Sequence, residues 1–575
     1  MDRTEDQDWP LRTWALALLG AIVALAIHFI ADHAGHFTDK PQLLALATFL
    51  GIGGIAFAFT LERERIGWSA SFALVTGAVV ASVIFWNGGP NDWDASDGWR
   101  IVCAALAVAI AAPLFQAARA EGRWHLPYEQ VHDQAWTNVI LWFAAWLFVG
   151  IVWLLAFLLG ALFALIGIDL VEKALREGVV ASALTGASFG GAVGLLRDRA
   201  HILGLLQRVV RTVLAVLAPV LGAGLILFLL SLPFTGLAPL WDATKSTTPI
   251  LLGCIVGALI LANAVIGDSP EDEARHPALR FGAMALGIAM LPLGVIAAIS
   301  VALRIGQYGL TPSRLWAVLF VFVACVYGLG YWWALARRRL GWAGAVRGVN
   351  LALAIGLCAL ALLLSTPLVS FGALSARDQV ARLQSGRTSV EQFDWAAMAF
   401  DFRPAGRHAL GRLKAQGATA AIRRKATTAL AAKDRWTLAG EQKQAETRAD
   451  FVRDVTILPK RVPLPQDLLA AVGRAGGCGA KAERATCLLY YRPGSNQAAL
   501  VSLSGSCDTC LPVVTALVRR PDGWKQGYEV GRPSATDKAR TGRLREAARR
   551  GEIELRTVER RQIFVGGEPL GDTFP

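Results

Sequence analysis

The chain changes character near residue 375. Before that point, apolar stretches of about 20 residues follow one another, for example 139–166, 209–232 and 351–368. An apolar run of 18 or more residues with few charges is long enough to cross the ~30 Å hydrocarbon core of a bilayer as a helix. The remaining third has ordinary soluble composition. The sequence therefore predicts a multi-spanning membrane domain over 1–375 and a small soluble domain over 376–575.

The apolar part contains about eleven predicted spans. They must be helices, because an open strand edge in lipid would leave backbone N–H and C=O groups without partners, at several kcal/mol each. The weakest span is 177–195, which is rich in small residues and is therefore suited to close contact between helices. The predicted spans are 11–30, 42–60, 67–86, 99–118, 138–166, 177–195, 209–232, 247–267, 279–303, 313–336 and 345–368.

Basic residues in the loops predict the orientation. With the N-terminus in the cytoplasm, the inner loops and ends hold 16 Lys and Arg residues and the outer ones hold 7. Short cytoplasmic loops carry the excess of basic residues in membrane proteins. Eleven crossings then place the soluble domain outside the cytoplasm.

The soluble domain is predicted to be α+β, with helices first and an antiparallel sheet after them. Helices are expected at 407–416, 419–432, 467–472 and 536–550, and strands at 486–491, 498–504, 513–519, 524–530 and 553–558. The stretch Thr388-Ser-Val-Glu391 matches a capping box, in which the first and fourth side chains satisfy N–H groups at a helix start. It predicts a further helix at 389–399.

The excess positive charge of the protein lies in the soluble domain. Residues 376–575 contain 34 basic and 21 acidic residues, a net charge of +13, and residues 1–375 are balanced. A solvated arginine-rich surface would explain this charge. Attraction to an anionic surface would explain it too, since each basic group near charged lipid contributes roughly 1 kcal/mol. Nucleic acid is not an expected partner, because no recognition motif is present and the domain is placed outside the cytoplasm.

Polar residues inside the predicted spans are few. His28, Asn263 and Asn350 are candidate functional positions, because polar groups within a bilayer are costly. No span carries a carboxylate near its middle, which argues against an ion-coupled transporter. Movement of a lipid or another amphiphile needs only a groove.

Four cysteines occur in the soluble domain, at Cys478, Cys487, Cys507 and Cys510. An even number outside the cytoplasm favours disulfides, with Cys478–Cys487 and Cys507–Cys510 as the preferred pairs. Zinc binding and redox catalysis by the Cys507-Asp-Thr-Cys510 motif are the alternatives. Redox catalysis is disfavoured because a thioredoxin-like motif begins a helix, whereas strands are predicted on both sides of Cys507-Asp-Thr-Cys510.

No signature of a catalytic or cofactor site was found. The histidines at 28, 33 and 36 do not share one helix face. Asp92-Trp-Asp-Ala-Ser-Asp-Gly98 places its glycine one position too late for a calcium loop. The chain also lacks the motifs of serine hydrolases, zinc proteases and P-loop proteins. We therefore predict no metal and no cofactor, and we do not favour an enzyme.

Several stretches resemble a bacterial membrane-protein family known as domain of unknown function 4153. The similarity covers residues 130–400 best and implies a many-spanning protein with an appended soluble region, without an assigned activity or site residues. The stretches that carry it are Leu217-Ala-Pro-Val, Leu232-Pro-Phe-Thr-Gly, Asn263-Ala-Val-Ile-Gly-Asp268, Tyr308-Gly-Leu-Thr-Pro-Ser-Arg-Leu-Trp316 and Asp378-Gln-Val-Ala-Arg.

The favoured function is that of a bacterial inner-membrane protein whose basic outer domain engages an anionic envelope component or another envelope protein. The alternatives are a transporter or lipid-handling protein, and a thiol-redox enzyme. The lipid bilayer is the one partner that the apolar spans require. The sequence makes no prediction of the oligomeric state.

Overall fold

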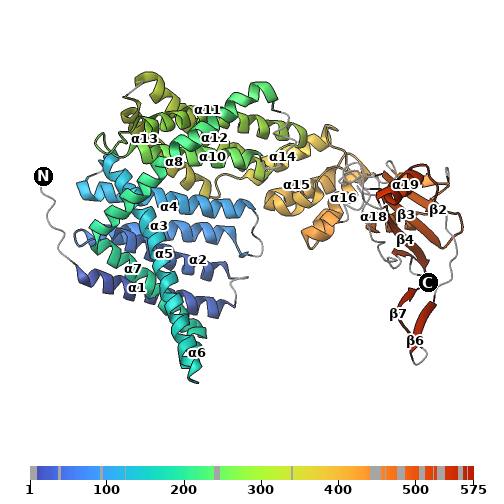
Figure 1. Cartoon of the computed structure of the whole chain (residues 1–575), viewed down its shortest axis with the longest axis horizontal. Coiled ribbons are helices and arrows are strands. Elements are labelled where there is room, and N and C mark those ends of the chain that lie inside the picture. Colours follow the sequence, from blue (N-terminus) through green and yellow to red (C-terminus); the bar gives the residue numbers. More distant parts are fainter. Residues whose placement is uncertain are drawn as a thin grey trace. The chain divides into compact units, whose positions relative to one another are not determined.

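Eleven helices of the described chain are long and apolar enough to cross a membrane (Figure 1). This confirms the predicted fold class of an all-α membrane part followed by a small α+β part. The chain divides into two units, Met1–Asp378 and Gln379–Pro575. The computed structural model describes residues 9–35, 40–90, 93, 95–123, 125–237, 247–338, 341–440, 455–459, 462–475, 486–503, 512–521, 523–526, 538–553, 561–565 and 568–574.

The regular secondary structure described in the first unit is all helical. Pro10, Pro41 and Pro277 begin helices, where the missing N–H of proline would have had no partner in any case. Its helices are α1 (Pro10–Ala34), α2 (Pro41–Thr60), α3 (Ile66–Asn87), α4 (Ala95–Glu121), α5 (Tyr128–Leu165), α6 (Leu170–Arg176), α7 (Gly178–Asp198), α8 (Ala200–Thr235), α10 (Thr247–Ile266), α11 (Pro277–Tyr308), α12 (Pro312–Arg338), α13 (Trp342–Ser365) and α14 (Phe371–Gln384).

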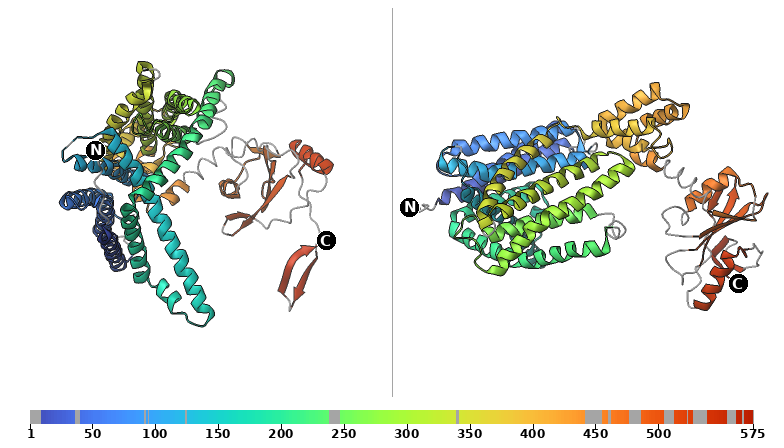
Figure 2. Two further views of the ribbon diagram at one scale, coloured as in Figure 1. Left: turned by 60° about the vertical axis from the view of Figure 1, so that its left-hand side comes forward. Right: turned by 90° about the horizontal axis from the view of Figure 1, so that it is seen from above.

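Several buried cores pack the helices of this unit against one another. One buried core joins α1, α2, α5 and α7, and another joins α8, α10, α11, α12 and α13. The chain of α5 is 38 residues long, which corresponds to a rise of about 57 Å. Figure 2 (left) shows α5, in cyan, continuing beyond the neighbouring helices toward the short helix α6.

The weakest predicted span, α7, is a helix held close to α1 by glycines. A Cβ atom at Gly186 would overlap the carbonyl of Gly20, and one at Gly190 would overlap the carbonyl of Leu16. Small residues let two backbones approach where lipid supplies no hydrophobic drive for association. The small-residue composition that weakened the hydropathy signal is therefore what positions this helix.

Arginines bind the ends of two helices in the first unit. Arg119 and Arg197 donate hydrogen bonds to the carbonyls of Thr60 and Phe59 at the end of α2. Arg347 donates to the carbonyls of Ile266 (2.7 Å) and Gly267 (3.4 Å) at the end of α10. The last carbonyls of a helix carry partial negative charge and lack partners within the helix, so a guanidinium stabilises them. All three arginines belong to the set predicted to face the cytoplasm.

The second unit begins with helices and ends with strands. Its described elements are η3, a π-helix (Ala397–Asp401), α15 (Arg403–Gln416), α16 (Ala420–Ala431), β1 (Val455–Leu458), α18 (Gln466–Ala475), β2 (Thr486–Tyr491), β3 (Gln497–Leu503), β4 (Val513–Arg520), β5 (Gly523–Gln526), α19 (Lys538–Arg549), β6 (Arg561–Val565) and β7 (Glu568–Phe574).

The five-stranded sheet has the order β1-β2-β3-β4-β5 and is mixed. Strands β2 to β5 pair antiparallel, as predicted, but β1 pairs with β2 in parallel. Neither β1 nor the two-stranded sheet of β6 and β7 is among the predicted strands. Strand β1 is only four residues long and precedes Pro459, so its periodicity is too short to recognise. The predicted strand at 553–558 falls mostly outside the described residues.

The predicted helix at 389–399 begins later than the capping box suggested. Residues 388–393 form turns, with Ser389 accepting a hydrogen bond from the backbone N–H of Gln392 (3.2 Å). The side chain of Asp394 instead accepts from the N–H of Ala397 (2.8 Å) and caps the helical segment that starts at Trp395. An aspartate is as good an N-cap as a serine or threonine, and the residues on either side of it, Phe393 and Trp395, are both buried.

Candidate functional site

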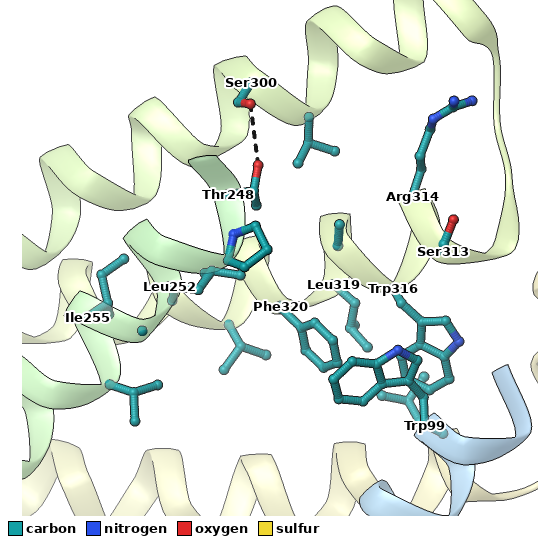
Figure 3. Close-up of a pocket in the computed structure, with 18 of the residues that line it drawn as sticks. Trp99, Thr248, Leu252, Ile255, Ser300, Ser313, Arg314, Trp316, Leu319 and Phe320 are labelled. Atoms are coloured by element: carbon teal, nitrogen blue, oxygen red, sulfur yellow. Dashed lines mark hydrogen bonds between the residues drawn. The ribbon is translucent and has the colours of Figure 1, made fainter. Parts of the chain in front are cut away.

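The first unit contains a cavity of about 1200 Å³ between α4, α10, α11, α12 and α13 (Figure 3). It is open at the protein surface, where the lining residues Val256, Leu303 and Tyr308 are 56%, 50% and 64% exposed. Its walls are mainly aliphatic and aromatic. Small-molecule sites usually occupy ~300–1,000 Å³, so this cavity is large for its class.

Polar side chains gather at one end of the cavity. That end is formed where α10 and α12 begin and α11 finishes. The residues are Thr248, Ser300, Arg304, Gln307, Ser313 and Arg314. The hydroxyl groups of Thr248 and Ser300 form a 3.3 Å hydrogen bond, which is drawn as a dashed line in Figure 3.

Arg314 is held in place by the end of α11. Its guanidinium donates to the carbonyl oxygens of Gly309 (2.7 Å) and Tyr308 (3.2 Å) and lies 5.4 Å from the centre of the Tyr308 ring. These contacts fix the arginine where the chain turns from α11 into α12, and the positive charge lies at the polar end of the cavity.

Aromatic rings line the side of the cavity formed by α4 and α12. The ring of Trp99 lies 4.6 Å from that of Phe320 and 6.2 Å from that of Trp316, centre to centre. Trp316 is 3% exposed, and within the described residues its indole N–H has no hydrogen-bond acceptor. A buried indole N–H normally has a partner, so this group is available to an oxygen atom of a ligand.

The apolar part of the cavity is about one leaflet deep. Along α10 the apolar lining runs from Pro249 to Leu259, which is ten residue steps and a rise of ~15 Å. The hydrocarbon core of a bilayer is ~30 Å thick. The cavity therefore has the depth of one hydrocarbon chain in a single leaflet.

A buried polar cluster lies next to the apolar end. Asn263, one turn beyond Leu259 on α10, donates to the Leu259 carbonyl (2.8 Å) and to the hydroxyl of Tyr331 on α12 (3.2 Å). Asn350 on α13 donates to Oδ1 of Asn263 (2.7 Å). We call Tyr128, His132, Asn263, Tyr331 and Asn350 the polar cluster.

Helix α5 joins the polar cluster through its first turns. The Tyr128 hydroxyl lies 2.9 Å from Nδ1 of His132 and 3.4 Å from Oδ1 of Asn263. Within the described residues, Nε2 of His132 and Oδ1 of Asn350 are buried without a hydrogen-bond partner. Four helices are therefore connected by polar contacts beyond the apolar end of the cavity.

The structure brings two of the three predicted intramembrane positions together. Asn263 and Asn350 are in direct contact in the polar cluster. His28 lies elsewhere, against Phe29 and beside Gly178 at the start of α7.

The predicted cysteine sites are mostly outside the described residues. Cys478, Cys507 and Cys510 lie there. Cys487, in β2, is half of a disulfide bond, and no disulfide joins two described cysteines. The described part of the chain holds no group of three or more His, Cys, Asp or Glu side chains placed to bind a metal.

Sequence reasoning missed the cavity and three members of the polar cluster. Tyr128 and His132 were placed before a span that was expected to begin at residue 138, whereas α5 begins ten residues earlier. Pro127 was an available signal, because a proline often stands at a helix start. Tyr331 lies within the apolar span predicted at 313–336. Only the structure reveals that its hydroxyl accepts hydrogen bonds from Asn263 and Asn350.

No family model matches this chain, and no curated protein or solved structure matches it either.

Proposed function

We propose that this multi-spanning membrane protein binds an amphiphile, such as a lipid, in the cavity between α4 and α10–α13. The observation that carries the proposal is the cavity itself, which is apolar over the depth of one leaflet and polar at one end. Hydrocarbon chains gain free energy by burial against aliphatic and aromatic walls, and polar groups at the mouth would contact the head group.

The polar end favours a head group with negative charge or oxygen acceptors. Gln307 can donate from its amide there, and the Trp316 N–H lacks an acceptor within the described residues. Arg304 and Arg314 lie at the same end and already have partners within the protein. A guanidinium pairs well with phosphate or carboxylate oxygens. The proposal belongs to the lipid-handling class and requires no coupled ion.

Photolabelling tests this proposal on the full-length protein. A phospholipid with a diazirine in its acyl chain would be added at low stoichiometry to the protein in detergent. We expect modification to concentrate on the peptides of α10 and α12 that hold Leu252 and Leu319. Labels spread evenly over exposed apolar surfaces, such as those of α1 and α5, would contradict it.

A second candidate function is favoured by the charge of the second unit. Residues 403–435 contain nine basic residues and one acidic residue, a net charge of +8. This supports the prediction of an envelope protein whose soluble part engages an anionic partner. This second function also depends on the predicted location in a bacterial inner membrane, with the C-terminus outside the cytoplasm. A tag at Pro575 should then be digested by protease in intact spheroplasts, and protection of the tag would contradict the orientation.

Two further assignments remain proposals on the sequence alone. Membership in the family of unknown function 4153 is supported by the stretches given above and assigns no activity. Thiol-redox catalysis by Cys507 and Cys510 predicts that replacing both with serine abolishes function, and unaltered function would dismiss it.

A further inference from the structure

Seven basic residues of the second unit, without any acidic residue among them, lie on the helices α15 and α16. α15 and α16 bury Leu410, Leu413, Ile422 and small residues on their inner faces. The outer faces carry exposed basic side chains, among them Arg407, Arg412, Lys414, Arg424 and Lys425. The apolar positions repeat at helical spacing and form the inner face of each helix, and the basic side chains are distributed over the rest of its circumference.

A large aromatic side chain is exposed five residues after the end of α16 in the chain. Trp436 is 79% exposed and is the one exposed large aromatic among the described residues of the second unit. The segment before it is held firmly, because the Arg435 guanidinium forms two hydrogen bonds with the Asp401 carboxylate (2.7 and 2.9 Å). This ion pair raises the pKa of Arg435.

Exposed tryptophan with clustered arginine and lysine is the composition of surfaces that lie at a membrane interface. The indole ring partitions into the head-group region, and basic side chains are attracted to anionic lipid. Helices α15 and α16 also follow α13, the last membrane-length helix, in the chain. The end of α13 at Ser365 and the start of α15 at Arg403 are 38 residues apart. A short tether gives a high effective concentration at the bilayer.

We propose that α15, α16 and Trp436 form a docking surface for the anionic surface of the lipid bilayer. The inference rests on the second candidate function and specifies lipid as the anionic partner. The basic residues supply a salt-sensitive attraction that is screened within ~10 Å at 0.1 M salt. Trp436 supplies an apolar contact that salt does not weaken.

Hydrogen–deuterium exchange of the full-length protein in lipid nanodiscs tests this docking surface. We expect amides of 420–437 to exchange several-fold more slowly in discs rich in phosphatidylglycerol than in discs of phosphatidylcholine. Addition of 0.5 M salt should remove most of the difference. Equal exchange in both kinds of disc would overturn the inference.

Matched charge reversals locate the surface. Arg424→Glu with Lys425→Glu should abolish the protection by anionic lipid, and Trp436→Ala should reduce it. The control reverses two exposed arginines of α19, Arg543→Glu with Arg549→Glu, and should retain the protection. Equal loss in both double variants would show a response to net charge alone and would contradict a defined surface.

A soluble anionic polymer separates this inference from the function on which it rests. If polyglutamate protects residues 420–437 in phosphatidylcholine discs while anionic lipid does not, the lipid surface is wrong and the second candidate function stands. If neither polyglutamate nor anionic lipid protects these residues, both the docking surface and the second candidate function are wrong.

Discussion

The side-chain amide of Asn350 donates a 2.7 Å hydrogen bond to Oδ1 of Asn263, although the two residues are 87 positions apart in the chain. The contact joins α13 to α10 inside the apolar part of the protein. Together with Tyr331, which is fully buried, it fastens the helices that form the cavity at the end opposite the polar mouth. The cavity is accordingly expected to remain closed at that end while the polar cluster is intact.

Replacing either asparagine with leucine should destabilise the membrane unit. Leucine has nearly the same size but leaves the partner amide without a hydrogen bond. Polar contacts between membrane helices contribute about 0.6 kcal/mol on average and up to ~1.7. A double-mutant cycle with Asn263→Leu and Asn350→Leu, measured by unfolding in detergent, should give a coupling within that range. Strictly additive effects would show that the contact contributes nothing.

The contact between α1 and α7 should be intolerant of even one methyl group. Gly190→Ala would place a Cβ atom against the Leu16 carbonyl, whereas a Cβ at Gly204 in α8 meets no atom within 4 Å. Overpacking of this kind costs ~1–3 kcal/mol, and Gly204→Ala should be neutral or stabilising because alanine favours a helix. Thermal unfolding of the two variants in the same detergent measures the difference, and equal midpoints would argue against the close contact.

Arg119 should contribute far more to the stability of the folded protein than a nearby surface arginine does. Its side chain is 3% exposed and contacts Glu62 (2.6 Å), Ser69 (2.9 Å) and the Thr60 carbonyl. Arg119→Ala leaves the α2 carbonyls without this donor, at ~1–3 kcal/mol. Arg123→Ala is the control, since Arg123 is 72% exposed and its ion pair with Glu121 is 3.9 Å long; surface pairs contribute ~0–1 kcal/mol. A similar loss of stability in both variants would contradict the structural role of Arg119.

Hydropathy was enough to predict the membrane-length helices, because the bilayer imposes a length and an apolar composition on each one. Asn263 and Asn350 could be recognised as unusual for the same reason. Their contact could not be recognised, since it depends on which of the helices are neighbours and on the rotation of each about its axis.

The cavity was not predictable from composition. Its lining residues, such as Leu252 and Leu319, are the same residue types that face lipid elsewhere. Only the packing of α10 to α13 distinguishes the two surfaces. The start of α5 was missed because its first turns are polar, so the hydropathy signal began after His132.

The cysteine pairing remains a prediction that peptide mapping can settle. Under non-reducing conditions, digestion should give one linked product with Cys478 and Cys487 and one with Cys507 and Cys510. The result follows from the short separations in the sequence and from an oxidising compartment. A linkage of Cys487 to Cys507 or Cys510 would contradict the pairing, and free thiols at all four positions would also contradict the predicted compartment.

A bulky side chain in the cavity tests most directly whether an amphiphile binds there. Gly253 lines the cavity, and a Cβ atom there meets no atom within 4 Å, so Gly253→Phe adds a ring at the cavity wall without overlap at Cβ. Gly224→Phe on the exposed side of α8 is the matched control, because a Cβ atom there also meets nothing within 4 Å.

Native mass spectrometry of the purified full-length variants, with unfolding midpoints to verify the fold, measures the retained lipid. We predict that the wild-type protein and Gly224→Phe carry a lipid adduct that survives removal of detergent, and that Gly253→Phe loses it. Equal retention of the adduct by Gly253→Phe would show that the cavity is not where an amphiphile binds.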